Sequence, residues 1–190
     1  ANEEFTKWLQ GEKSMPFGEN NAHVPIRLID FENISNNSFI VTNQFKFYHR
    51  ETKIPDVVLL INGIPVVVGE AKTPVRPSVS WLDGAHEIHD IYENEARQLF
   101  VPNIFSFATE GKEFYYGSVR CPLQIWAPWR LQSGDEELVD ALGLKEVGKE
   151  LNEILNPKVL LEILQNFCLF SSDKKNRRIK IVSRYQQFDG

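Results

Sequence analysis

Three charged residues, Asp56, Glu70 and Lys72, stand at the outer ends of two apolar segments. The segments are joined at Asn62-Gly63, a dipeptide typical of β-hairpin turns. A hairpin brings the start of its first strand beside the end of its second, so Asp56 and Glu70 are expected to meet at the open end. Lys72 lies two residues after Glu70 and therefore faces the same side. Two carboxylates and an ammonium group in this arrangement suit metal-dependent hydrolysis of a phosphodiester.

The length of the hairpin loop decides whether the two carboxylates share a face of the sheet. A regular two-residue loop at Asn62-Gly63 would point Asp56 and Glu70 to opposite faces. A three-residue loop that includes Ile61, or a β-bulge in one strand, would return them to one face. Gly63 suits the left-handed position of a three-residue loop because it lacks a Cβ. We therefore expect an odd-numbered loop or a bulge.

Bound Mg²⁺ supplies what this hydrolysis requires: an activated water, neutralised charge at phosphorus and a stabilised leaving oxygen. The ion prefers oxygen ligands and keeps several waters, so one or two carboxylates suffice to hold it. We expect Asp56 and Glu70 to bind Mg²⁺, or Mn²⁺ in its place, with the Ala71 carbonyl as a third ligand. Lys72 would stand near the attacking water or the scissile phosphate. Without metal, the crowded carboxylates repel each other, which predicts a raised proton affinity.

The structural alternative for these residues is simple. Asp56 would only begin a strand, and Glu70 with Lys72 would form a surface ion pair of little energetic consequence. Three matching positions on one hairpin favour the catalytic interpretation over this alternative.

Composition is that of an ordinary globular protein, with 190 residues, of which 42% are hydrophobic and 25% charged. No apolar run approaches the roughly 20 residues of a membrane helix, and no secretory leader is visible, so we expect no membrane association. Cys121 and Cys168 have neither disulfide nor zinc spacing, which suits a reducing cytoplasm. The chain starts at Ala1, and its one Met is Met15, so we expect a piece of a longer protein.

The net charge of −5 argues against tight DNA binding by the chain alone, because neutralising phosphates drives most such affinity. A catalytic module whose substrate is delivered by a neighbouring domain is compatible with that charge. Basic residues gather near the C-terminal end, where a solvated surface and a nucleic-acid contact are equally open interpretations: Lys174, Lys175, Arg177, Arg178, Lys180 and Arg184.

Hydrophobic periodicity predicts an α/β sandwich, a mixed sheet with flanking helices. The expected strands are Ile26–Phe31, Phe39–Tyr48, Asp56–Leu60, Pro65–Ala71, Ile104–Ala108 and Phe114–Val119. The expected helices are Glu3–Leu9, one from Ser78 or Ser80 to about Leu99, and two between Glu136 and about Phe170 that are separated at Asn156-Pro157. Leu82, Ala85, Ile88, Ile91 and Ala96 form the apolar face of the second of these helices.

The pair Pro55-Asp56 and Glu70-Ala71-Lys72 resembles the signature of the PD-(D/E)xK nucleases. Its context makes residues 24 to 130 similar to the amino-terminal nuclease domain of the restriction (motor) subunit of type I restriction-modification enzymes. The context consists of Asp30-Phe-Glu-Asn33, Asn37-Ser-Phe-Ile-Val-Thr-Asn-Gln-Phe45, Asn103-Ile-Phe-Ser-Phe-Ala-Thr-Glu-Gly111 and Tyr116-Gly-Ser118. The rest of the chain resembles that subunit more loosely.

This resemblance implies a PD-(D/E)xK restriction-endonuclease-like fold with a C-terminal helical extension. It divides the chain into an endonuclease domain at 1–130, a helical extension or linker at 131–172 and the start of a motor domain at 173–190. It implies Mg²⁺-dependent cleavage of duplex DNA after ATP-driven translocation, within a cytoplasmic complex with methyltransferase and specificity subunits. ATP would serve only the motor, because this chain has no Walker A sequence. The alternatives are a nuclease-like docking module between motor and methyltransferase, and a repair or resolving nuclease of the same superfamily.

Several further residues are weaker candidates. Gln44 and Lys46 are candidates for contact with DNA. Many relatives of this nuclease carry a Gln and a Tyr one turn apart on the helix after the lysine; Tyr92 fits the tyrosine, but Ile88 stands at the glutamine position. Tyr92 is therefore a candidate both for DNA contact and for packing. Glu32 is expected to be solvent-exposed rather than a metal ligand. The same is expected of His86 and His89, which lie three residues apart on one helix.

Overall fold

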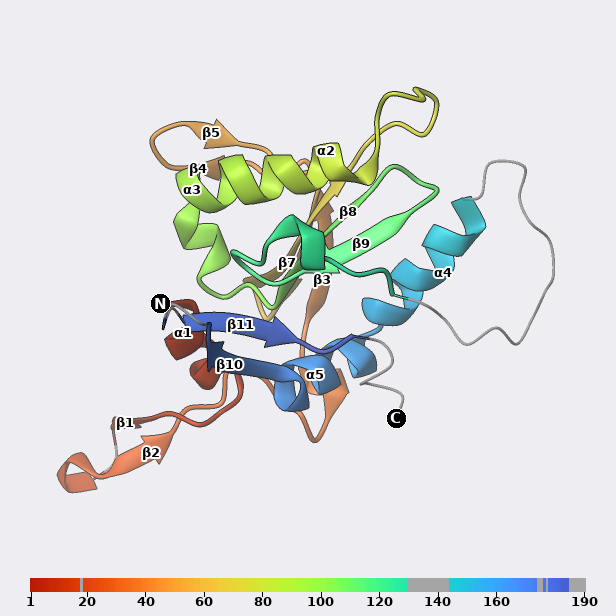
Figure 1. The fold of residues 1–190 in the computed structure, drawn as a ribbon. Helices are drawn as coiled ribbons and strands as arrows, with labels where there is room; N and C mark the ends of the chain where they lie inside the picture. Colours follow the sequence, from red (N-terminus) through yellow and green to blue (C-terminus); the bar gives the residue numbers. More distant parts are fainter. Residues whose placement is uncertain (18, 130–143, 174–175, 177, 185–190) are drawn as a thin grey trace.

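A mixed five-stranded sheet forms the centre of the computed structural model, which describes residues 1–17, 19–129, 144–173, 176 and 178–184 (Figure 1). The strand order is β3-β6-β7-β8-β9; β7 and β8 run parallel and the other neighbours antiparallel. The strands are β3 (Phe39–Asn43), β6 (Val57–Ile61), β7 (Ile64–Ala71), β8 (Phe105–Thr109) and β9 (Phe114–Gly117). The predicted mixed sheet is confirmed, and the arrangement is consistent with an endonuclease-like fold.

Helices cover both faces of this sheet (Figure 1). Val58 and Val68 pack with one helical layer, and their neighbours Leu59 and Val67 pack with the other, as the alternation of side chains along a strand requires. The first layer is α2 (Trp81–His86), the π-helical turn η3 (Glu87–Tyr92), α3 (Glu93–Glu95) and η4 (Arg97–Phe100). The second layer is α1 (Asn2–Leu9), α4 (Leu144–Ile154) and α5 (Pro157–Asn166).

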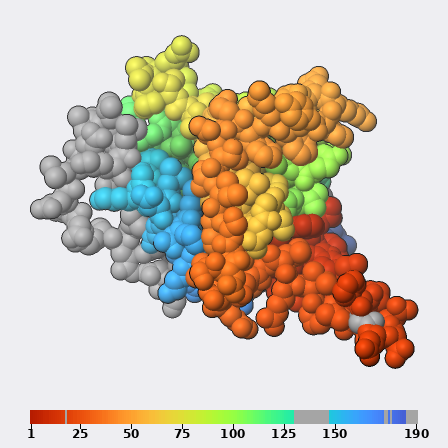
Figure 2. Space-filling model, turned by 180° about the vertical axis from the view of Figure 1, so that it is seen from behind, coloured from red at the N-terminus to blue at the C-terminus, as the bar shows by residue number. Residues whose placement is uncertain are grey.

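Three two-stranded hairpins surround this core. The β1–β2 hairpin stands out from the body of the molecule, at the lower right of Figure 2. The C-terminal hairpin, β10–β11, is fastened to β9 and the residue after it. The Tyr116 hydroxyl donates to the Ser183 carbonyl at 2.7 Å, and Ser118 Oγ donates to the Lys180 carbonyl at 2.7 Å. The hairpins are β1 (Ser14–Pro16) with β2 (His23–Pro25), β4 (Phe47–Tyr48) with β5 (Thr52–Lys53), and β10 (Cys168–Ser172) with β11 (Arg178–Val182). Short 3₁₀ turns lie at Glu19–Asn21, Ile34–Asn36 and Leu123–Ile125.

Two of the predicted strands differ from the structure. The strand expected at Ile26–Phe31 is absent, because Asp30 Oδ1 accepts the backbone N–H groups of Glu32 and Asn33 and turns the chain. The strand expected at Phe39–Tyr48 is divided by Gln44, whose left-handed backbone (φ 50°) ends β3 before β4 begins.

The C-terminal helices are separated where the sequence predicts. Asn156 caps α5, its Oδ1 accepting the Lys158 backbone N–H at 3.0 Å, and Pro157 occupies the first helical position. The helix ends at Asn166 rather than near Phe170, since β10 begins at Cys168. α4 and α5 pack into the same core as the sheet, while the predicted domain boundaries stay predictions, and residues 131–143 lie outside the described part.

The helix expected from Ser80 to Leu99 contains a π-helical turn that the periodicity does not reveal. Asp83 Oδ2 accepts the Ser80 backbone N–H at 2.8 Å, so the predicted cap is confirmed. Leu82 and Ile91, expected on the apolar face, are each 41% exposed. Tyr92, four residues after the buried Ile88, enters the core in place of Ile91. Within the described residues, no helix combines the length and the apolar character needed to cross a membrane.

Replacing Gly69, in β7 beside the candidate site, by alanine is expected to destabilise the fold. The added Cβ would lie 2.2 Å from Cζ of the Phe107 ring, which is buried in the core. Overpacking of this kind costs about 1–3 kcal/mol in the free energy of unfolding. The matched control is Gly148→Ala in α4, where nothing lies within 4 Å and a gain of about 0.5–1 kcal/mol is expected. Urea unfolding of both variants checks the pair, and equal effects would contradict the tight approach at Gly69.

Candidate active site

The β6–β7 hairpin places the two carboxylates on one face by means of a bulge. Ile61 pairs directly with Ile64, so the loop has two residues and the expected odd-numbered loop is wrong. Leu59 pairs with Val67 and Leu60 with Pro65, which leaves Val66 as an extra residue in β7. The predicted bulge is therefore confirmed. Pro65 suits a position next to a bulge, since it has no backbone N–H to donate.

The turn itself has the geometry that a tight hairpin requires. Asn62 and Gly63 both adopt left-handed backbones, with φ of 52° and 80°. The left-handed Gly63 is confirmed, although within a two-residue loop. Beyond the bulge, Val57 pairs with Gly69, so the next residues along, Asp56 and Glu70, lie opposite each other.

Direct contacts join the predicted pair of carboxylates. The Asp56 backbone N–H donates to Glu70 Oε1 at 3.3 Å, and the Ala71 backbone N–H donates to Asp56 Oδ2 at 3.0 Å. Gln44 Nε2 donates to Asp56 Oδ1 at 2.6 Å, so Gln44 touches a candidate metal ligand, and its contact with DNA stays a prediction. The role of the Ala71 carbonyl as a third ligand stays a prediction.

Burial by α2 gives Glu70 an unusual proton affinity. A Cβ added at Gly84 of α2 would lie 3.0 Å from Glu70 Cβ, so the absence of a side chain there lets the helix close over the strand. Glu70 is 1% exposed. Burial, and then the hydrogen bond and charge of Asp56, raise the pKa of Glu70 to about 7. The raised proton affinity expected of the metal-free site is thus borne out at Glu70.

Lys72 lies between two carboxylates and stays protonated. Its Nζ is 3.2 Å from Glu70 Oε2 and also forms an ion pair with Glu87 Oε2. Burial alone lowers the pKa of Lys72, but the hydrogen bonds and charges of Glu87 and Glu70 outweigh burial and raise it above the ordinary lysine value. The side chain is therefore an ammonium group at neutral pH.

Glu87 is the residue that sequence reasoning missed. Its Oε1 accepts a hydrogen bond from the Tyr92 hydroxyl at 2.8 Å, while its Oε2 holds Lys72. Burial, followed by the hydrogen bond to Glu87, raises the pKa of Tyr92 well above its ordinary value, so the hydroxyl remains a donor. An α-helical reading of the sequence gives no signal for this pair, because residues five apart face different sides of an α-helix.

The remaining candidates lie as follows. Lys46 is exposed in the segment that leads to β4, and the Tyr92 ring is 5% exposed in the core; contacts of either with DNA stay predictions. Glu32 is exposed, as expected. His86 and His89 both bind Asp90, each through Nδ1 at 2.7 Å; His86 is exposed, as expected, whereas His89 is half-buried.

Hard oxygen donors make the Asp56–Glu70 pair suitable for Mg²⁺. Burial first, and then the neighbouring Asp56, raise the pKa of Glu70, and a cation between the two carboxylates would offset both effects. In the part of the chain that the structure describes, no group of three or more His, Cys, Asp and Glu side chains could hold a metal. Mg²⁺ held by two carboxylates and water remains compatible with this.

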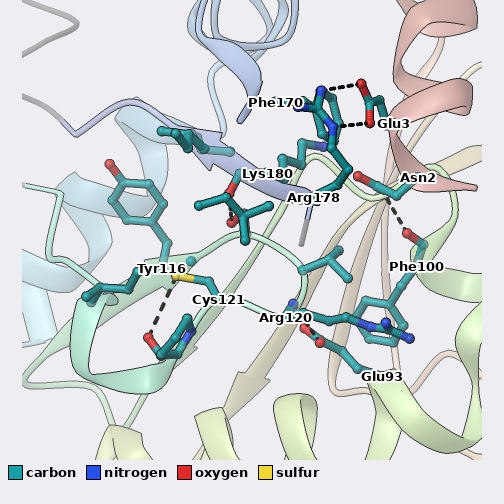
Figure 3. Close-up of a pocket in the computed structure, with 18 of the residues that line it drawn as sticks. Asn2, Glu3, Glu93, Phe100, Tyr116, Arg120, Cys121, Phe170, Arg178 and Lys180 are labelled. Atoms are coloured by element: carbon teal, nitrogen blue, oxygen red, sulfur yellow. Dashed lines mark hydrogen bonds and ion pairs between the residues drawn. The ribbon is translucent and has the colours of Figure 1, made fainter. Parts of the chain in front are cut away.

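A cavity of about 890 Å³ lies elsewhere, between β9, β11 and η4 (Figure 3). None of Asp56, Glu70 and Lys72 lines it. Several of its charged side chains bind neighbouring protein groups: Arg178 pairs with Glu3 at 2.6 Å, Lys180 Nζ donates to the Asn103 carbonyl at 2.7 Å, and Glu93 Oε2 accepts the Arg120 backbone N–H at 2.8 Å. These groups fasten β11 and the loop after β9 to the core.

Comparison with known proteins identifies the family to which the chain belongs. A family model described as type I restriction enzyme R protein N terminus matches residues 1–124. The type I restriction enzyme HindI endonuclease subunit of Haemophilus influenzae is 30% identical over an alignment 193 residues long, which covers 100% of this chain and 18% of that protein. Two putative type I restriction enzyme endonuclease subunits of Methanocaldococcus jannaschii, MjaVIIIP and MjaVIIP, are 29% and 31% identical over 86% and 85% of this chain.

Each of these two matches covers 15% of the archaeal protein, so this chain spans less than a fifth of the length of its curated relatives. The family model nevertheless covers well over half of the chain and includes the whole Asp56–Lys72 hairpin and the helix after it. The chain belongs to the family of type I restriction enzyme R protein N termini.

Proposed function

We propose that this chain is a Mg²⁺-dependent endonuclease module of the PD-(D/E)xK type that hydrolyses phosphodiester bonds of duplex DNA. One observation carries the proposal: the bulge in β7 sets a register in which Asp56 and Glu70 lie opposite each other, with Lys72 beside Glu70. Asp56 and Glu70 would hold the metal. The names of the relatives, which are endonuclease subunits, support the same class of reaction.

The chain's own residues have distinct tasks in this proposal. The bound metal would activate water and neutralise charge on the phosphate. Asp56 is oriented by the Ala71 backbone N–H and by Gln44, and Glu70 is held rigid by burial. Lys72, protonated at neutral pH, acts as a fixed positive charge toward the phosphate rather than as a base that removes a proton from water.

The proposal also includes the larger enzyme in which this chain would act. We place the module in a cytoplasmic complex with methyltransferase and specificity subunits, in which another subunit reads the target sequence. Cleavage would follow ATP-driven translocation by a motor outside these 190 residues. Delivery of DNA by that motor would explain how a chain of net charge −5 acts on a polyanion.

Asp56→Asn in the full-length subunit, assembled with its partner subunits, tests the proposal. The amide keeps the shape of Asp56 but removes a negative metal ligand, so DNA cutting is expected to fall by a factor on the order of 10² or more. ATP hydrolysis is expected to be unchanged, because the motor is separate. The control is Glu113→Gln, an exposed carboxylate on the β8–β9 turn. Wild-type cutting by Asp56→Asn would refute the assignment.

The net charge also favours a second candidate, a docking module that does not cut DNA. Calorimetry with Mg²⁺ and with Mn²⁺ separates the two. A nuclease module is expected to bind the ions, and Asp56→Asn is expected to lower its affinity for them. A docking module would show no binding that this substitution changes.

A further inference from the structure

We infer that Glu87 is a positioning residue for Lys72, and that the π-helical turn η3 presents it for this task; the inference rests on the proposed nuclease function. Glu87 contacts Lys72 through Oε2 and accepts the Tyr92 hydroxyl through Oε1. The chain thus contains a fixed series of three side chains, Tyr92, Glu87 and Lys72, that ends at the candidate site.

The π turn is what allows the first contact in this series. Residues five apart on an α-helix point about 140° away from each other. In η3, Glu87 and Tyr92 are five apart and yet form a hydrogen bond of 2.8 Å. The wider π turn therefore brings them onto one side, and turns of this type recur at functional sites.

Tyr92 gives Glu87 a fixed place. The tyrosine ring is 5% exposed and lies in the same apolar cluster as Ile88 and Ala96. Its hydroxyl binds Glu87 Oε1, which leaves Oε2 directed at Lys72. The Glu87 side chain is 33% exposed and the Lys72 side chain 25%, so the pair is partly withdrawn from water.

Lys72 needs a partner other than Glu70. Both carboxylates contact its Nζ, but the oxygens of Glu70 are also the proposed metal ligands. Glu87 Oε2 contacts the ammonium directly and gives Lys72 this second partner. A long, flexible lysine without Glu87 would sample several rotamers instead of one.

Variants of the full-length subunit in its assembled complex test the inference in single-turnover DNA cleavage. Glu87→Ala is expected to lower the cleavage rate constant about 10²-fold, since misplacing a reacting group by about 1 Å has effects of this size. Glu87→Gln keeps one acceptor oxygen, which can serve either Tyr92 or Lys72 in place of the two carboxylate oxygens, so a smaller loss of about tenfold is expected. Tyr92→Phe should lower the rate less than Glu87→Ala. The matched control is Asp90→Asn, an exposed carboxylate on the same turn, with wild-type cleavage expected.

The dependence on metal concentration distinguishes positioning from metal binding. The Mg²⁺ concentration for half-maximal cleavage is expected to stay the same in the Glu87 variants while the maximal rate falls. A large rise in that concentration would make Glu87 a metal ligand and overturn the inference. Wild-type cleavage by Glu87→Ala would also overturn it. If Asp56→Asn cuts like wild type, the proposed function itself fails; if Asp56→Asn is inactive and Glu87→Ala is not, only the present inference fails.

Discussion

Replacing Glu70 by glutamine is expected to abolish DNA cutting and, at the same time, to make the folded chain more stable above pH 7. Cutting falls, by a factor on the order of 10² or more, because a proposed metal ligand loses its charge. Stability rises because the pKa of Glu70 is about 7 in the folded chain, against an ordinary glutamate value of 4.5 in the unfolded chain. The folded state therefore binds this proton more tightly than the unfolded state does.

The sign and the pH window of this gain follow from the two pKa values. Below pH 4.5 the carboxyl is protonated in both states and imposes no cost. As the pH rises from 4.5 to about 7, the unfolded chain ionises first, so the wild type loses stability over that window. The full shift corresponds to about 3 kcal/mol, and the loss of the Glu70–Lys72 contact in the variant reduces the expected gain to about 1–2 kcal/mol.

Urea unfolding of wild type and Glu70→Gln at both ends of this window measures the gain. The difference in the free energy of unfolding between wild type and variant should be largest above pH 7 and should disappear toward pH 4.5. Glu113→Gln, exposed on the β8–β9 turn, is expected to show no such pH-dependent difference. A variant that loses both cutting and stability above pH 7 would mean that Glu70 is a structural carboxylate.

The residues of the hairpin were predictable because their arrangement depends on local pattern. The Asn62-Gly63 turn, the apolar strands and the charged ends are all visible within 17 residues, from Asp56 to Lys72. A three-residue loop, or a two-residue loop with a bulge, each puts Asp56 and Glu70 on one face of the sheet. Periodicity could restrict the register to these two solutions but could not choose between them. Pro65 was the available signal for the bulge, since it lacks the N–H that a regular ladder uses.

The environment of the site depends on contacts that local pattern does not contain. The burial of Glu70 comes from α2, which approaches closely at Gly84, and the partner of Lys72 comes from η3. A π turn adds one residue to a helical turn, so an α-helical period assigns Glu87 and Tyr92 to different faces. Ile91 was assigned to the apolar face because i+3 and i+4 from Ile88 are both compatible with it, and the structure buries Tyr92. The strand expected at Ile26–Phe31 does not form. Its apolar alternation predicted a strand, but the side chain of Asp30 binds the backbone N–H groups of the following residues and turns the chain.

The same raised pKa predicts that divalent cations bind this chain strongly only above about pH 7. A carboxyl must lose its proton to bind a metal, so proton and cation compete for Glu70. Below its pKa of about 7, the apparent affinity for Mn²⁺ should fall about tenfold for each pH unit. Calorimetric titration with Mn²⁺ across this range measures the slope.

Glu93 provides the matched control for this experiment. Burial, opposed by the Arg120 backbone N–H, raises its pKa to about 7 as well, but Glu93 lines the cavity of Figure 3 and not the Asp56–Glu70 pair. Glu93→Gln is therefore expected to change the pH dependence of stability and to leave the pH dependence of Mn²⁺ binding intact. Glu70→Gln is expected to abolish the pH dependence of Mn²⁺ binding. Because Mn²⁺ would remove the cost of ionising Glu70, the ion should also stabilise the wild-type fold more at pH 8 than at pH 6, and equal stabilisation at both would mean that the cation binds elsewhere.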